Sequence, residues 1–274
     1  MTEWERSIIE KLRVAPGEKF RLKDRDPRDS SLFGDEKETK AATATLAKNI
    51  DALQDRLYAE GSRALLIILQ GTDTSGKDGT IRSVFNSTGP LGVSVHAFGP
   101  PSKLELEHDY LWRVHAACPR RGTIGIFNRS QYEDVLIAKV RGLASKEAIE
   151  QRYEQINAFE RLLVENGTTV LKFMLHISKD EQKERLQARL DDPTKHWKFN
   201  PSDLEDRKHW DEYQEAYEIM LQRCSTPHAP WHVVPADRKW VRNAAIASIV
   251  KATLEAMDPQ YPSVSWNPSD FQIP

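Results

Sequence analysis

The sequence contains a glycine-rich string, GTDTSGKDGTI at residues 71–81, whose residue types and spacing could bind phosphate groups. It directly follows the apolar run ALLIILQ. A glycine-rich turn between a buried strand and a helix gathers backbone N–H donors around one point, and Lys77 adds a cationic donor. In the usual loop of this type a Ser or Thr follows the lysine and binds Mg²⁺, but here Asp78 occupies that position. The string therefore predicts a phosphate site with an altered metal ligand.

The two acids of this loop are expected to differ in role. Asp73 lies inside the loop, where a carboxylate would repel bound phosphates unless a metal ion intervened. Asp78 offers a second hard oxygen ligand, although the helix dipole alone also favours an acid in the first turn of a helix. We therefore expect Asp73, more than Asp78, to bind Mg²⁺. The residues assigned to phosphate contacts are Gly71, Thr74, Ser75, Gly76, Lys77, Gly79, Thr80 and Arg82.

A second cluster of polar residues, IGIFNRSQYEDVL at 124–136, begins in another predicted strand. Asn128 and Arg129 would emerge at the carboxyl end of that strand, beside the phosphate loop. Arg129 could neutralise charge on a phosphoryl group during transfer. Glu133 could bind metal through water or hold Arg129, whereas Asp134 is better explained as an ordinary acid at a helix start.

A third cluster, RLDDPTKHWKFNPSDLEDRKHW at 189–210, joins two predicted helices through a proline-containing segment. P-loop kinases carry a mobile helical lid in this part of the chain, and its cations would attract a polyanion and exclude water. A solvated charged hairpin is the competing interpretation for any single residue. Trp197 and Trp210 are expected to pack within the hairpin. The lid cations assigned to phosphate binding are Arg189, Lys195 and Lys198.

Alternating strands and helices must bring these clusters together. Predicted strands cover 64–71, 92–99, 123–130, 168–178 and 231–237, and predicted helices cover 36–60, 103–118, 145–165, 179–190 and a last segment ending near Met257. Such alternation implies a parallel sheet covered by helices on both faces. We expect a single domain over 1–274, with an extended N-terminal arm at 1–35 and the lid at about 189–212.

The composition limits the classes of function. The 274 residues include 39 Lys plus Arg and 41 Asp plus Glu, for a formal net charge of −2. A dedicated nucleic-acid-binding protein is usually strongly basic, so this balance argues against one. The two cysteines lie in no C-x-x-C context, and no apolar stretch approaches the ~20 residues that span a bilayer. We expect a cytoplasmic protein with neither nucleic-acid nor membrane partners.

The three clusters together resemble the type-2 polyphosphate kinase family over roughly residues 12 to 258. The resemblance rests on GTDTSGKDGTIRSVF, FNRSQYEDVL, LKFMLHISKDEQKERLQARLDDPTKHWKF, DLEDRKHWDEYQEAYE and APWHVVPADRKWVRN. An Asp after the loop lysine is typical of that family, so Asp78 supports the resemblance. The implied fold is a P-loop kinase-like three-layer αβα sandwich with a central parallel sheet and a helical lid.

The resemblance also implies an activity. The family moves the terminal phosphoryl group reversibly between inorganic polyphosphate and a nucleotide, with Mg²⁺ or Mn²⁺, and we expect in-line transfer without a covalent intermediate. NRSQYEDVL is similar to the third subgroup, so AMP would pass to ADP and ADP to ATP, with GMP and GDP as further acceptors. Family members commonly form homodimers or homotetramers. By matching motif positions, the implied catalytic residues are Asp73, Lys77, Arg129 and Glu133, the nucleotide-binding residues Asp78, Asn128 and Arg129, and the metal ligands Asp73, Asp78 and Glu133.

Two other functions fit part of the pattern. A nucleoside or nucleotide kinase using ATP as donor would be expected to hold Mg²⁺ on a loop Ser or Thr, which this loop lacks. A non-catalytic nucleotide-binding scaffold would have little reason to keep Lys77, Arg129 and the acids together. Product formation from polyphosphate and AMP or ADP, without ATP, separates the polyphosphate-dependent enzyme from both.

Overall fold

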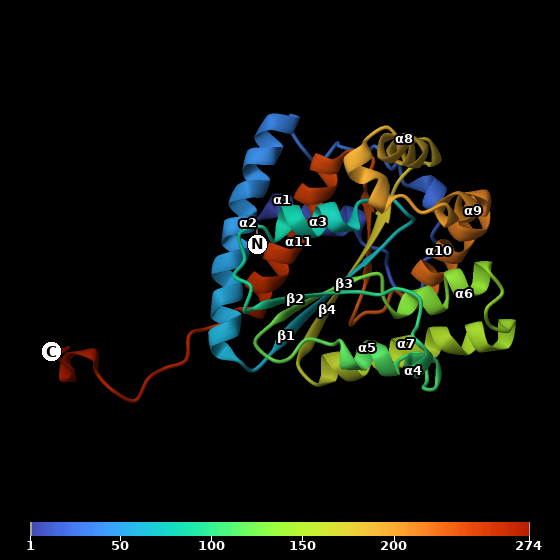
Figure 1. The fold of residues 1–274 in the computed structure, drawn as a ribbon. Coiled ribbons are helices and arrows are strands. Elements are labelled where there is room, and N and C mark those ends of the chain that lie inside the picture. Colours follow the sequence, from blue (N-terminus) through green and yellow to red (C-terminus); the bar gives the residue numbers. More distant parts are fainter. Residues whose placement is uncertain (1, 274) are drawn as a thin grey trace.

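A computed structural model describes residues 2–273, and its five strands form one parallel sheet (Figure 1). The strands are β1 Ala64–Gln70, β2 Val93–Ala97, β3 Ile124–Asn128, β4 Thr168–His176 and β5 Trp231–Pro235. Their order is β2-β3-β1-β4-β5, and the register places Ile67 of β1 between Ile126 of β3 and Leu171 of β4. Central β1 is buried along its whole length, as expected for an apolar run that packs against helices on both faces. All five strands lie within the predicted segments.

Helices cover both faces of this sheet. They are α1 Glu3–Leu12, α2 Glu36–Glu60, α3 Lys77–Val84, α4 Lys103–Leu106, α5 Trp112–Ala116, α6 Ile137–Val140, α7 Lys146–Glu165, α8 Lys179–Leu190, α9 Ser202–Lys208, α10 Trp210–Cys224 and α11 Lys239–Met257, with the 3₁₀ helices η1 Leu22–Asp24, η2 Gln131–Asp134, η3 Pro193–Lys198 and η4 Pro268–Asp270. One layer contains α1, α2, α3 and α11, and the opposite layer contains α5, α6, α7 and α10 (Figure 1). The predicted three-layer αβα sandwich is confirmed.

Two apolar clusters hold the layers together. Side chains alternate across a strand, so Leu65, Ile67 and Leu69 of β1 join the cluster under α2 and α11. Leu66 and Ile68 point the other way, into the cluster under α7 and α10. The glycine-rich string at 71–81 follows the carboxyl end of β1, whose residues are all buried. None of the helices described is long and apolar enough to cross a bilayer.

The N-terminal segment differs from the expected extended arm. Residues 3–12 form α1, which starts at a reciprocal cap in which Glu5 N donates to Thr2 Oγ1 and Thr2 N donates to Glu5 Oε2. The apolar side of α1 buries Ile8 in the cluster under α11. Later residues of the segment, including Phe20, are also buried. The prediction was wrong here because a ten-residue helix shows too few turns of apolar spacing.

The segment predicted as one helix over 103–118 is two short helices, α4 and α5. Asp109 lies between them, and its Oδ1 accepts a hydrogen bond from the backbone N–H of Leu111 at 2.9 Å. Such a local side-chain bond offers the backbone an alternative to the helical ladder and so interrupts the helix.

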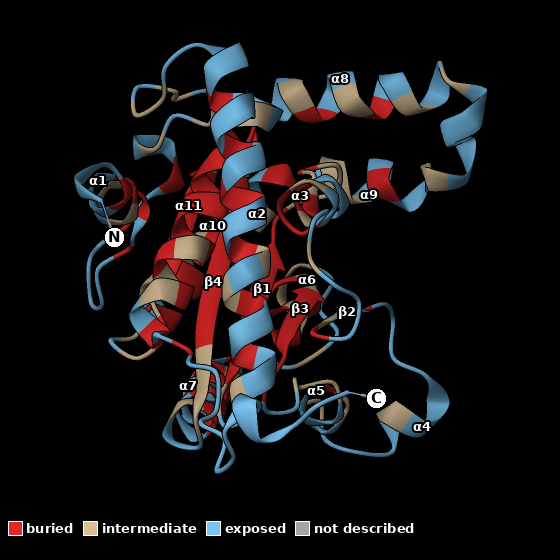
Figure 2. Ribbon diagram, turned by 90° about the vertical axis from the view of Figure 1, so that its left-hand side faces the viewer, coloured by how far each residue is buried: buried red, intermediate tan, exposed pale blue. Residues whose placement is uncertain are grey.

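The predicted helical lid is present as a hairpin of α8, η3 and α9, and Figure 2 shows it projecting from the body with few buried residues. Trp210 does not pack in the hairpin, because it starts α10 and is buried in the body. Trp197 is 76% exposed, and the ammonium of Lys198 lies 4.9 Å from its ring centre. The expectation that both tryptophans pack within the hairpin was therefore wrong.

Candidate active site

A cavity of about 470 Å³ opens at the carboxyl edge of the sheet, where the segments after β1, β3, β4 and β5 meet. It lies between the glycine-rich loop and the lid. Eight Lys or Arg side chains and two Asp side chains line it. The predicted site residues in its wall are Asp73, Thr74, Gly76, Lys77, Asp78, Gly79, Asn128, Arg129, Arg189, Lys195 and Lys198.

The glycine-rich loop has a backbone that few residues other than glycine adopt. The φ angle is +150° at Gly71 and +104° at Gly76, values that L-residues with a side chain rarely adopt. Gly76 is also the N-cap residue of α3. A Cβ atom on Gly76 would lie 1.8 Å from Nη1 of Arg242. The loop therefore needs glycine at 76 both for its conformation and to admit this guanidinium group.

Lys77 is buried under the loop. Its ammonium donates to the carbonyl oxygens of Gly71 at 2.7 Å and Thr72 at 3.3 Å. Burial, and then repulsion by the positive charge of Arg129, lowers the pKa of Lys77 to about 8. An anion bound in the cavity would supply the compensating charge that this ammonium lacks.

Several hydroxyl groups of the loop are buried without a hydrogen-bond partner in the part of the chain that the structure describes. They are Thr72 Oγ1, Thr74 Oγ1, Ser75 Oγ and Thr80 Oγ1. Buried hydroxyls normally find a partner, and each of these could donate to a phosphate oxygen. The loop thus carries unused donors at three positions assigned to phosphate contacts.

Arg129 is held in a left-handed conformation, with φ +64°. Its Nη2 lies 2.5 Å from Asp73 Oδ1, and its Nη1 lies 3.6 Å from Glu133 Oε2. Burial alone would lower the pKa of Arg129, but the carboxylates of Glu133 and Asp73 outweigh it and hold the pKa above its ordinary value. The expectation that Glu133 holds Arg129 agrees with this contact. The guanidinium group therefore stays charged at the mouth of the loop.

The acids assigned to metal binding do not form a preformed cluster. Asp73 and Asp78 both line the main cavity, and Asp78 Oδ1 accepts a hydrogen bond from Asn128 Nδ2 at 2.6 Å. Glu133 instead lines an adjoining, much smaller cavity of about 40 Å³. Within residues 2–273, no three His, Cys, Asp or Glu side chains are close enough together to hold a metal ion. This arrangement suits Mg²⁺, which usually takes one or two carboxylates and completes its shell with water and substrate phosphates.

Sequence reasoning missed three cations in the cavity wall, the first of which is Arg185 of α8. Its guanidinium group donates to the backbone oxygens of Thr74 at 2.9 Å and Ser75 at 3.1 Å, and to those of Ala236 and Asp237 beyond β5. Arg185 therefore ties the phosphate loop after β1 to the segment after β5. The available signal was its position one helical turn before Arg189 on the same face of α8.

The other two missed cations, Lys239 and Arg242, lie in the first turn of α11. Arg242 is buried, and it donates to Ser75 O at 3.3 Å and to Asn243 Oδ1 at 2.9 Å. Burial, and then repulsion by Arg185, lowers the pKa of Arg242 to about 10. Basic residues directly after the last predicted strand were the signal for this pair.

The lid cations reach the cavity but differ in their contacts. Arg189 donates to Lys198 O at 2.9 Å and lies 3.4 Å from Asp203, so it also braces the hairpin. Lys195 is paired with Asp192 at 2.7 Å. Burial, and then repulsion by the Asp73 carboxylate, raises the pKa of Asp203 to about 6.

Some predicted site residues do not line the main cavity. Arg82 is exposed on α3 and lines none of the cavities described, so the structure does not bring it to the site. Gly71, like Glu133, lines the adjoining small cavity. Ser75 and Thr80 are fully buried within the loop and the start of α3.

Known proteins are similar to this chain in both sequence and fold. The profile of the family described as Polyphosphate kinase 2 (PPK2) matches residues 34–262. An AMP/ADP-polyphosphate phosphotransferase of Meiothermus ruber is 51% identical over 255 residues, which cover 93% of this chain and 96% of that protein. An ADP-polyphosphate phosphotransferase of Rhodopseudomonas palustris is 39% identical, with 92% of each chain covered. The crystal structure of Polyphosphate Kinase 2 from Arthrobacter aurescens TC1 has a TM-score of 0.94 at 43% identity, covering 98% of this chain and 96% of that chain.

Proposed function

Because the chain belongs to the polyphosphate kinase 2 family and is thereby a polyphosphate-dependent nucleotide kinase, we propose that it converts AMP to ADP and ADP to ATP. The 51% identical relative is named for both AMP and ADP, whereas the 39% identical relative is named for ADP alone. The higher identity supports the wider acceptor range. GMP and GDP are proposed as further acceptors.

The excess of cations in the cavity is the observation that carries this proposal. Eight basic and two acidic side chains line it, although the whole chain has a formal net charge of −2. A single nucleotide needs fewer cations than this, whereas a long polyanion matches a track of positive charge. The polyphosphate is proposed to lie along the basic residues Arg185, Arg189, Lys195, Lys198, Lys239 and Arg242.

The residues around the loop are proposed to act by positioning and charge neutralisation. The loop N–H groups, its free hydroxyls and Lys77 would bind the terminal phosphates of the chain. A terminal phosphate oxygen of the acceptor nucleotide attacks the last phosphorus atom in line. The bridging P–O bond breaks, and a polyphosphate one unit shorter leaves with the bonding electron pair. Arg129 neutralises the charge that develops during this transfer.

Asp73, assisted by Asp78, is proposed to hold Mg²⁺ or Mn²⁺. Both carboxylates line the cavity, and two hard oxygen ligands fit a cation that also takes phosphate oxygens and water. Such a cation, when bound, neutralises charge on the reacting phosphates. If the Asp73 carboxylate bound the cation, its ion pair with Arg129 would be broken. The Arg129 guanidinium group could then donate to phosphate oxygens.

The proposed activity is tested with AMP or ADP, polyphosphate and Mg²⁺ in the absence of ATP, with products separated by chromatography. We expect ADP and ATP from AMP, and ATP from ADP. A parallel reaction with ATP and AMP but no polyphosphate measures ordinary nucleotide kinase activity. Product in this second reaction alone would refute the proposal in favour of an ATP-dependent enzyme.

We also propose that the chain works as a homodimer or homotetramer in the cytoplasm. Light scattering during gel filtration measures the assembly directly. A monomer at the concentrations used for turnover would contradict the proposed assembly without affecting the proposed reaction.

A further inference from the structure

A group of buried polar side chains lies inside the apolar layer between the sheet and α7. Glu160 of α7 and Lys172 of β4 are both fully buried and form an ion pair at 2.6 Å. The Tyr132 hydroxyl donates to Glu160 Oε1 at 2.7 Å, and Gln131 Nε2 donates to the same oxygen at 3.1 Å. Lys172 Nζ also donates to Tyr132 Oη at 2.8 Å and to the carbonyl oxygen of Cys224 at 2.7 Å. We call Glu160, Lys172, Tyr132 and Gln131 the buried network.

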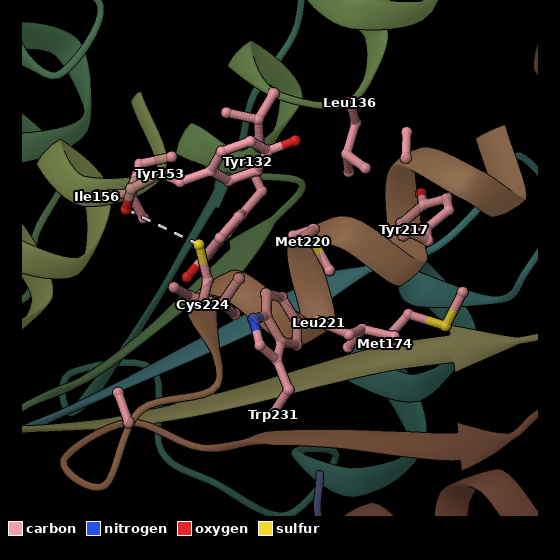
Figure 3. Close-up of a cluster of buried hydrophobic side chains, with 14 of the residues drawn as sticks. Tyr132, Leu136, Tyr153, Ile156, Met174, Tyr217, Met220, Leu221, Cys224 and Trp231 are labelled. Atoms are coloured by element: carbon pink, nitrogen blue, oxygen red, sulfur yellow. Dashed lines mark hydrogen bonds between the residues drawn. The ribbon is translucent and has the colours of Figure 1, made fainter. Parts of the chain in front are cut away.

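The ion pair of the buried network is fully satisfied although its surroundings are apolar, whereas Gln131 Oε1 has no hydrogen-bond partner within residues 2–273. Lys172 uses all three of its N–H donors, and both oxygens of Glu160 accept hydrogen bonds. The ring of Tyr132 packs against Trp231 with centroids 4.8 Å apart, among the buried side chains shown in Figure 3. Apolar residues of similar volume often stabilise a core as well as such an ion pair does. Stability of the core therefore gives little reason for charge at this place.

The two residues that the ion pair holds belong to the segment that carries Arg129. Gln131 and Tyr132 begin η2, and Ser130 alone separates them from Arg129. The left-handed backbone is energetically unfavourable for a non-glycine residue, so Arg129 needs support on both sides. On the strand side, Arg129 N donates to Leu69 O at 3.0 Å. On the other side, Gln131 and Tyr132 are anchored through their side chains to the ion pair.

We propose that Glu160 and Lys172 are positioning residues for phosphoryl transfer. They fix η2, and η2 fixes the direction in which Arg129 and Glu133 leave the backbone. The hydrogen bonds that Glu160 and Lys172 make to Gln131 and Tyr132 are directional and so fix the position of η2. Apolar side chains in their place would allow η2 to shift. The inference rests on the role proposed above for Arg129, so Arg129→Ala is measured in parallel.

The first test compares two Tyr→Phe substitutions in the same core cluster. Tyr132→Phe keeps the ring but removes the hydroxyl that links Glu160 to Lys172. Tyr153→Phe is the matched control, because its buried hydroxyl has no hydrogen-bond partner within residues 2–273. A displacement of about 1 Å in a catalytic group can lower turnover by as much as about 100-fold. We expect Tyr132→Phe to lower kcat at least about tenfold, with KM for polyphosphate and ADP within about twofold, and Tyr153→Phe to leave kcat unchanged.

A second test separates positioning from stability. Glu160→Gln/Lys172→Met and Glu160→Leu/Lys172→Met both remove the charges, but only glutamine keeps an oxygen for Tyr132 and Gln131. We expect the glutamine variant to have the higher kcat even where the leucine variant has the higher melting temperature. Activity that simply follows melting temperature would overturn the inference.

The outcomes distinguish this inference from the function it rests on. If Arg129→Ala keeps wild-type kcat, the proposed role of Arg129 fails and the inference fails with it. If Arg129→Ala loses turnover while Tyr132→Phe and the leucine variant keep it, only the positioning inference is overturned.

Discussion

We expect Arg242→Met to stabilise the ligand-free protein and to lower its affinity for polyphosphate. Arg242 is 2% exposed, and within the described chain no Asp or Glu oxygen lies within 4.0 Å of its guanidinium nitrogens. Its neighbours are Ser75 O, Asn243 Oδ1 and the like charge of Arg185. The fold therefore holds a buried positive charge beside the phosphate loop with no anion to balance it.

The size of the effect follows from the pKa of Arg242. Burial and repulsion lower that pKa to about 10, from an ordinary value above 12. A tenfold change in proton affinity corresponds to about 1.4 kcal/mol, so holding this charge costs about 3 kcal/mol at neutral pH. Methionine would recover that cost and lose three hydrogen bonds, one to Ser75 O and two to the single acceptor Asn243 Oδ1, which we count as about 1 kcal/mol per acceptor. Ser75 O keeps its bond from Arg185, so we expect a net gain of about 1 kcal/mol in the free energy of unfolding.

Urea unfolding without ligand measures this gain as a higher midpoint at an unchanged slope. Arg185→Met is the matched control, because Arg185 pairs with Glu181 at 2.7 Å and donates to four backbone oxygens. It should destabilise the free protein. A charge-assisted bond to phosphate is worth about 1.5–3 kcal/mol, so Arg242→Met should raise KM for polyphosphate by about 10- to 100-fold.

One result would refute this reasoning. If Arg242→Met destabilised the free protein by 1 kcal/mol or more and left KM for polyphosphate unchanged, Arg242 would be a structural residue of α11 and not part of an anion site.

Three further predictions concern the loop and the lid. Asp73→Asn should abolish metal-dependent transfer and move the melting temperature by no more than a few degrees, because its ion pair with Arg129 is partly exposed; retained turnover would remove Asp73 from the metal site. Lys198→Ala should raise KM for long polyphosphate more than KM for the nucleotide, and the reverse order would exclude its proposed role. Because the pKa of Lys77 is about 8, its charge is lost as pH rises through 8, so polyphosphate affinity should fall there in wild type but not in Lys77→Arg. Folding disfavours the Lys77 ammonium, so the free protein should also gain stability between pH 8 and about 10.

Local patterns in the sequence were enough to predict the architecture and part of the site. Apolar runs of strand length that alternate with helical segments predicted the five strands and that these strands run parallel. The string at 71–81 predicted the phosphate loop because glycine, lysine and strand–helix context are all local properties. Asn128 and Arg129 followed from the rule that strand ends meet at one edge of a parallel sheet.

Only the tertiary structure decided which other charges belong to the site. Arg185 lies on the charged helix α8, where it looks in sequence like a solvated cation, and Arg242 lies in the first turn of the mostly apolar helix α11. Local signals mark both positions as basic, but their burial beside Ser75 depends on how α8, α11 and the loop pack. The same holds for the partners of Glu160 and Lys172, which meet inside the core from α7, β4 and η2. The residue type determines what chemistry a side chain can do. Its charge state and its orientation depend on its partners and its solvation, and these are set by distant parts of the chain.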